Sequence, residues 1–214
     1  MRKIIITTIL IFLIAVAGAG LYFWASGNKK NESFFGSIQN TFSDNKNQEN
    51  GIKTVTLETV KADMKKYSPD SQINLKTRTY TNKKYGFSVK IPENMVVSNF
   101  QEGRYGEVIL IQGKDDSKKD SAWVQVFALP FDEKGLVTPQ RIHKDLPELE
   151  IDNPKYVVIG KNKFKALIFW SNESGLGKTR EIWFERNGYL FQITTIYKYE
   201  RILGEMLETI SFGN

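Results

Sequence analysis

The single histidine of this chain, His143, is the side chain with the clearest catalytic potential. One imidazole is enough for a triad with a serine nucleophile and a carboxylate, provided that all three come within hydrogen-bond reach. No serine stands in a nucleophile motif, and the neighbours Arg141, Lys144 and Asp145 are typical of a solvated helix face. We therefore predict a surface histidine and no catalytic residue, with a hydrolase that uses His143 as the alternative.

Metal and cofactor chemistry is limited by the composition. The chain has no cysteine, which excludes disulfides, iron–sulfur clusters and thiol catalysis, and one histidine cannot form a His₂ or His₃ metal site. Two groups of carboxylates could hold Ca²⁺, but neither has the spacing of an EF-hand loop. We predict solvated charges, no metal and no cofactor at these groups, which are Glu148, Glu150 and Asp152, and Asp115, Asp116 and Asp120.

A glycine-rich segment, Ser174–Thr179, resembles a phosphate-binding loop only superficially. The first glycine of that motif would stand at position 172, which is Asn172, and a strand-like segment follows where the motif requires a helix. A hairpin turn is the better interpretation. Aromatic residues of the flanking segments could line a ligand groove or, as we expect, form the core between sheet and helix; they are Trp123, Phe127, Phe169, Trp170, Trp183, Phe184 and Phe191.

The first residues predict where the protein lies in the cell. Residues 4–24 form an uncharged run of 21 residues, long enough to cross a bilayer as a helix. Arg2 and Lys3 before it favour a cytoplasmic N-terminus. We predict a single-pass anchor in the cell membrane over residues 1–26, with the rest of the chain outside the cytoplasm; the alternative is a signal peptide cleaved at Ala17-Gly18-Ala19. The anchor residues singled out are Ile4, Ile11, Leu13, Leu21, Tyr22 and Trp24.

The net charge is distributed unevenly along the chain. Of the formal +6, residues 1–26 carry +2, residues 27–79 carry +3 and residues 80–214 carry +1. The body of the protein thus has no net basic surface for a phosphate backbone, and we predict that it does not bind nucleic acid. Residues 27–79 are polar and poor in large apolar side chains, which predicts a flexible tether.

Two apolar groups interrupt this tether. The first has helical spacing just beyond the anchor and predicts contact with the membrane surface; a short nascent helix or a patch that docks on the domain explains it equally well. Its residues are Phe34, Phe35, Ile38 and Phe42. The second group predicts a helix that ends before Pro69, either in the tether or as the first helix of the domain. Its residues are Leu57, Val60, Met64 and Tyr67.

Residues 80–214 have the pattern of a folded α+β domain. Alternation over 85–91 predicts a strand with one buried face, apolar residues at 108–111 and 123–129 predict more central strands, and turns at 160–162 and 186–188 predict two hairpins. Thr138 and Pro139 begin a short helix that ends near Leu146, and apolar residues from Ile202 to Ile210 predict a second. We expect an antiparallel sheet of about six strands with helices on one or both faces.

These residues resemble a known family. The opening Tyr80–Pro92 with its Tyr-Gly-Phe, the short helix at 139–146, the long hairpins and the closing helix into Ile210-Ser211-Phe212 are similar to PsbP-like domains, although Met95 and Val96 stand where many members carry a tryptophan. The resemblance implies an α-β-α sandwich and a non-enzymatic accessory role. We therefore expect a membrane-anchored, extracytoplasmic binding module for an unknown protein partner, with a structural spacer as a further alternative.

Overall fold

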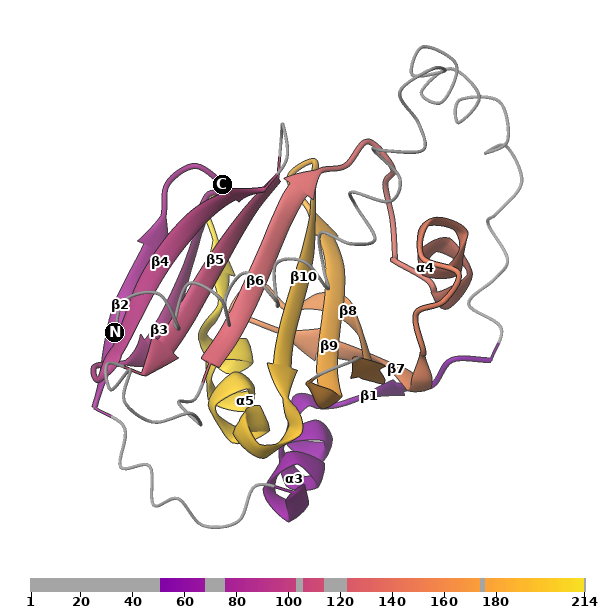
Figure 1. Ribbon diagram of the computed structural model, residues 1–214, viewed down its shortest axis with the longest axis horizontal. Helices are drawn as coiled ribbons and strands as arrows, with labels where there is room; N and C mark the ends of the chain where they lie inside the picture. Colours follow the sequence, from indigo (N-terminus) through magenta and orange to yellow (C-terminus); the bar gives the residue numbers. More distant parts are fainter. Residues whose placement is uncertain (1–50, 68–75, 103–105, 114–122, 174–175, 214) are drawn as a thin grey trace. The chain divides into compact units, whose positions relative to one another are not determined.

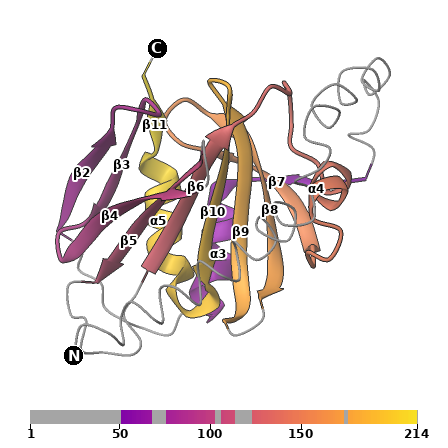
Figure 2. The same cartoon turned by 45° about the horizontal axis from the view of Figure 1, so that its top comes forward.

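The computed structural model describes residues 51–67, 76–102, 106–113, 123–173 and 176–213. A compact unit begins at Lys53 and extends to the C-terminus. This unit combines an eight-stranded sheet, a three-stranded sheet and helices (Figures 1 and 2), so the predicted α+β class is confirmed. The predicted anchor and membrane-surface segment lie outside the described residues.

The larger sheet has the order β1-β7-β8-β9-β10-β6-β5-β4. Every neighbouring pair is antiparallel except β1 with β7, which is parallel. The prediction of about six antiparallel strands was therefore wrong in number and in one pairing. The strands are β1 Thr54–Val55, β4 Met95–Glu102, β5 Gly106–Gly113, β6 Trp123–Pro130, β7 Asp152–Ile159, β8 Phe164–Glu173, β9 Gly177–Arg186 and β10 Tyr189–Ile196.

The three-stranded sheet has the order β11-β3-β2, with β2 Thr77–Asn82, β3 Phe87–Pro92 and β11 Ser211–Phe212. The alternation that predicted the strand over 85–91 is confirmed, because Phe87, Val89 and Ile91 are buried along β3. The expectation of a single sheet missed this second one. Its outer strands gave little signal, since β2 exposes most of its side chains and β11 has only two residues.

Both predicted hairpins are present. Asn187 and Gly188 join β9 to β10 with φ angles of 55° and 77°, the left-handed geometry that the Asn-Gly pair tolerates. Gly160 and Lys163, with φ of 71° and 51°, lie in the turn between β7 and β8. The link after Ser171 also forms a hairpin, because β8 extends to Glu173 and β9 begins at Gly177.

Helix α3 (Leu57–Tyr67) packs against helix α5 (Glu200–Thr209). A Cβ atom on Gly204 of α5 would lie 3.0 Å from Sδ of Met64, so glycine permits this close approach. Residues 53–67 therefore belong to the folded unit and not to a tether, and the predicted domain start at residue 80 falls inside β2. The helix predicted from Leu57, Val60 and Met64 is the domain's first helix, one of the two interpretations left open.

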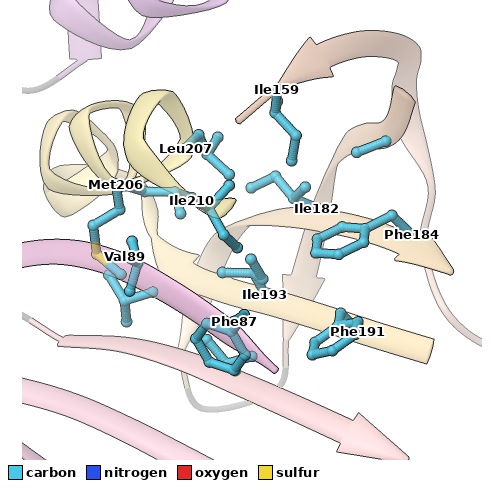
Figure 3. Close-up of a cluster of buried hydrophobic side chains, with 14 of the residues drawn as sticks. Phe87, Val89, Ile159, Ile182, Phe184, Phe191, Ile193, Met206, Leu207 and Ile210 are labelled. Carbon is cyan, nitrogen blue, oxygen red and sulfur yellow. The ribbon is translucent and has the colours of Figure 1, made fainter. Parts of the chain in front are cut away.

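The main core lies between the large sheet and a layer formed by α3, α5 and the small sheet. Figure 3 shows Met206 and Leu207 of α5, and Ile210 directly after it, directed into the core, which confirms the apolar stripe predicted for this helix. The phenyl rings of Phe184 and Phe191 are stacked with their centroids 5.1 Å apart. Around them pack Phe87, Val89, Ile159, Ile182 and Ile193.

Candidate functional site

No described helix is long and apolar enough to span a membrane. The six predicted anchor residues, Ile4 to Trp24, and the four predicted membrane-surface residues, Phe34 to Phe42, lie in the part of the chain that the structure does not describe. Membrane anchoring and contact with the membrane surface therefore stay predictions.

His143 lies on helix α4 (Pro139–Asp145), which begins as predicted: Thr138 precedes it and its hydroxyl accepts a hydrogen bond from the amide of Arg141. The imidazole is exposed, and its Nε2 lies 3.0 Å from the carbonyl oxygen of Leu149. Because a carbonyl only accepts, Nε2 carries the proton in this contact. This contact holds the imidazole against the segment that follows α4.

The carboxylates singled out from the sequence do not assemble. Glu148, Glu150 and Asp152 are all exposed, while Asp115, Asp116 and Asp120 lie outside the described residues. Across the ranges that the structure describes, no three acidic or histidine side chains are grouped closely enough to hold a metal ion. Of the glycine-rich segment, Lys178 and Thr179 lie in β9.

The aromatic residues divide between the two faces of the large sheet. Phe184 and Phe191 belong to the main core, as predicted, whereas Phe169 and Trp183 contact each other on the opposite face, with ring centroids 6.0 Å apart. On that opposite face the buried carboxylate of Glu181 accepts hydrogen bonds from the Thr194 hydroxyl at 2.7 Å and the Trp183 indole N–H at 3.3 Å.

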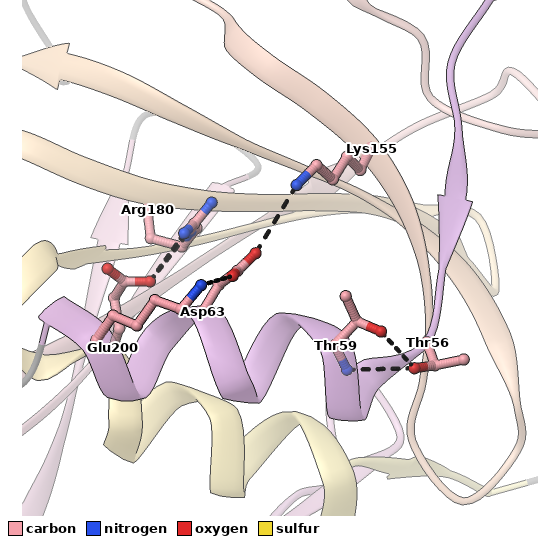
Figure 4. A network of polar contacts seen from close by, with 7 residues as sticks. Thr56, Thr59, Asp63, Lys155, Arg180 and Glu200 are labelled. Atoms are coloured by element: carbon pink, nitrogen blue, oxygen red, sulfur yellow. Dashed lines mark hydrogen bonds and ion pairs between the residues drawn. The ribbon is translucent and has the colours of Figure 1, made fainter.

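A groove of about 590 Å³ lies where β1 passes into helix α3. The Thr56 hydroxyl accepts a hydrogen bond from the amide of Thr59 at 3.2 Å and lies 3.0 Å from the Thr59 hydroxyl, which fixes the start of the helix (Figure 4). The walls come from three segments that are distant in sequence: β1 with the first turn of α3, the end of β7 with the β7–β8 turn, and the end of α5. The lining residues are Lys53, Thr54, Val55, Thr56, Leu57, Glu58, Thr59, Val158, Gly160, Lys163 and Glu208.

The groove carries both charges beside an apolar strip. Lys53 and Lys163 supply positive charge, and Glu58 and Glu208 supply negative charge. Lys61 of α3 binds Glu208 at 2.6 Å, and this hydrogen bond lowers the pKa of the Glu208 carboxyl. A surface of mixed charge and moderate apolarity suits a peptide better than a phosphate or a metal ion.

The backbone of β1 has one edge that no described strand covers. Thr54 pairs with Tyr156 in the parallel ladder, and the amide of Tyr156 donates to the Lys53 carbonyl at 3.0 Å. In a parallel ladder, a residue on one strand hydrogen-bonds to the two residues that flank its partner on the other strand. Tyr156 therefore bonds to the neighbours of Thr54, and the N–H and C=O of Thr54 itself point away from β7. Thr54, which also lines the groove, therefore has one donor and one acceptor at the free edge of β1.

Further along α3, charged side chains connect the two helices with the large sheet (Figure 4); they are Asp63 of α3, Glu200 of α5, Lys155 of β7 and Arg180 of β9. The Arg180 guanidinium pairs with the Glu200 carboxylate at 3.0 Å and lies 3.4 Å from the centroid of the Trp170 ring. Glu200 is fully buried, and this burial raises its pKa to about 7 even though Arg180 acts to lower it. Asp63 of α3 also raises the Glu200 pKa, and it lies 3.9 Å from Nζ of Lys155.

Sequence reasoning missed these features for identifiable reasons. Arg180 and Glu200 are 20 positions apart and belong to no motif, so only the packing of α5 on β9 brings them together. The groove depends on β1, a strand of two residues in a segment predicted as tether. The one usable signal was Thr56 directly before the apolar helix pattern, an N-cap that separates a strand from a helix.

Comparison with known proteins adds a structural likeness. No family model and no curated protein matches the chain. Among solved structures, the chain is similar to the solution structure of cyanobacterial PsbP (CyanoP) from Synechocystis sp. PCC 6803, with a TM-score of 0.44 and 12% identity over 68% of this chain and 98% of that one. Membership of the PsbP-like family therefore stays a prediction.

Proposed function

We propose that this chain is a membrane-anchored, extracytoplasmic binding module without catalytic activity, and that its folded unit, which begins at Lys53, is a PsbP-like domain. The anchor and the location follow from the uncharged run over residues 4–24, and the family from the sequence over Tyr80–Pro92. The domain acts by holding a segment of a protein partner.

The observation that carries this proposal is the groove beside β1. An extended segment that pairs with Thr54 adds a strand to the edge of the large sheet, a common mode of peptide recognition. Its side chains contact Val55, Leu57 and Val158, while Lys53 and Glu58 supply charges of opposite sign at the walls. The partner is accordingly an extended polypeptide segment with apolar and charged residues in alternation.

Site-specific photocrosslinking tests this proposal in native membranes. A benzophenone amino acid replaces Glu58, which lines the groove, and in a matched variant it replaces Ala62, one turn further along α3 and also exposed. We expect a discrete crosslinked partner from position 58 and none, or much less, from position 62. Equal adducts from both positions, or none from either, would contradict binding in the groove and favour a spacer.

A backbone variant separates strand addition from contact by side chains alone. Thr54→Pro removes the N–H that points away from β7 but keeps the hydrogen-bonding groups of Lys53 and Val55 that β1 directs at β7. We expect this change to reduce the adduct at position 58 severalfold while circular dichroism stays unchanged. An undiminished adduct would show that the partner does not pair with β1.

A further inference from the structure

Strand β4 forms one edge of the large sheet. It pairs along its whole length with β5, from Met95 opposite Gly113 to Glu102 opposite Gly106, without a bulge. Within the ranges that the structure describes, no strand pairs with its other side. Over eight residues of regular strand this edge has no strand partner, a longer run than in any other edge strand of either sheet, although the carbonyl oxygen of Met95 accepts a hydrogen bond from Arg78.

The sequence of β4 lacks the features that usually protect such an edge. From Met95 to Gln101 it has no charged residue and no proline, and Glu102 is its one ionisable group. Natural edge strands commonly avoid pairing with other chains because they carry a lysine or a proline, contain a β-bulge or are very short. By contrast, β1 and β11 have two residues each, and β2 carries Arg78 and exposes most of its side chains.

One hydrogen bond reveals which backbone groups face outward. Nη2 of Arg78 donates to the carbonyl oxygen of Met95 at 2.9 Å, so that carbonyl points away from β5. In an antiparallel ladder, alternate residues direct both backbone groups to the same side. Val97 and Asn99 therefore present their N–H and C=O groups at the free edge, while Val96 and Ser98 make the hydrogen bonds with β5.

We propose that two copies of this chain associate through β4, paired antiparallel about a two-fold axis at Ser98, so that the two large sheets become continuous. In this register Val97 of one copy lies opposite Asn99 of the other. Both residues have outward-facing backbone groups, so each such pair exchanges two hydrogen bonds. The segment is self-complementary, as a two-fold interface requires.

The side chains are compatible with the same register. Val96 and Phe100 lie on the sheet face opposite the main core, and both are half-buried. The two-fold axis places Val96 of one copy opposite Phe100 of the other, an aromatic and β-branched pair of the kind that stabilises cross-strand contacts. Glu102 falls opposite Asn94, so no like charges face each other.

The chain has no cysteine, which allows a direct test. Ser98 pairs with itself across the axis at a non-hydrogen-bonded position, where Cα atoms are about 4.5 Å apart, within the range that a disulfide spans. We expect the full chain carrying Ser98→Cys, in detergent micelles with a mild thiol oxidant, to form a disulfide-linked dimer. The rate should exceed that of Thr79→Cys, on exposed strand β2, at least about tenfold, because pairing raises the effective thiol concentration.

A second substitution distinguishes crosslinking through β4 from crosslinking that results from chance collisions or from contacts elsewhere in the chain. Asn99→Pro removes an outward N–H, which an edge strand tolerates, and leaves the β4–β5 hydrogen bonds intact. In the Ser98→Cys background it should lower crosslinking to the Thr79→Cys rate with no loss of circular dichroism signal. Equal rates for Ser98→Cys and Thr79→Cys, or crosslinking that survives Asn99→Pro, would overturn the proposal. Neither result bears on the groove at β1.

Discussion

Glu200, at the start of helix α5, is fully buried and holds Arg180 of strand β9 at 3.0 Å. A carboxylate without solvent contact normally requires full hydrogen bonding, yet Oε1 of Glu200 has no partner. Burial accordingly raises the pKa of this carboxyl to about 7. The contact between α5 and the sheet is thus sensitive to pH.

The first prediction concerns stability against pH. The folded protein binds the Glu200 proton more tightly than the unfolded chain, whose carboxyl has a pKa of 4.5. The stabilisation from this group is complete below pH 4.5 and is lost as the pH rises toward 7, to the extent of about 3 kcal/mol. Glu200→Gln should remove this dependence. Urea denaturation at several pH values, followed by tryptophan fluorescence, measures both profiles, and identical slopes in the two proteins would contradict the assignment.

The second prediction separates the charge of Arg180 from its packing. At pH 8, Arg180→Leu leaves a buried carboxylate without its cation and should cost about 3–5 kcal/mol of unfolding free energy. At pH 5 the loss should be smaller, because Glu200 takes up a proton. Lys178→Leu is the control, since Nζ of the exposed Lys178 lies 4.5 Å from the centroid of the same Trp170 ring; that change should cost less than about 1 kcal/mol at either pH. A loss at Arg180 that does not vary with pH would show that packing dominates.

The third prediction concerns Gly160 in the β7–β8 turn. Its φ of +71° is unfavourable for alanine, and a Cβ atom there would lie 2.5 Å from the carbonyl oxygen of Ile210. We expect Gly160→Ala to cost at least about 2 kcal/mol, from strain and clash together. Gly177→Ala isolates the strain, because Gly177 has φ of +75° but nothing within 4 Å of the added carbon. Equal melting temperatures for the two variants would argue against the clash.

The fourth prediction concerns the aromatic core. Phe191 stacks on Phe184 and makes edge contacts with Phe87 and Phe212, which joins β10 to the small sheet. Phe191→Ala should cost about 3–5 kcal/mol, through lost burial and the cavity left behind. The half-buried Phe127 on neighbouring β6 is the control, and Phe127→Ala should cost clearly less. Chemical denaturation of both variants gives the comparison.

The sequence by itself determined the parts of the fold that depend on local pattern. Alternation predicted β3 through Phe87 and Val89, and the Asn187-Gly188 pair predicted the β9–β10 hairpin. Thr138 predicted the start of α4, and the apolar stripe from Ile202 to Ile210 predicted α5. Each signal lies within a few residues, because side-chain period, turn geometry and capping are local properties of the backbone.

Only the tertiary structure decided the features that join distant segments. Thr54 becomes an edge strand because β7 lies beside it, and Met95–Glu102 becomes another because β5 pairs with it; neither has an apolar period of its own. The contact of Arg180 with Glu200 likewise requires α5 to lie on β9. Long-range packing decides how deeply a carboxyl is buried, and burial in turn sets its pKa. The pairing of distant strands decides which backbone edge stays free. No short stretch of sequence contains either kind of information.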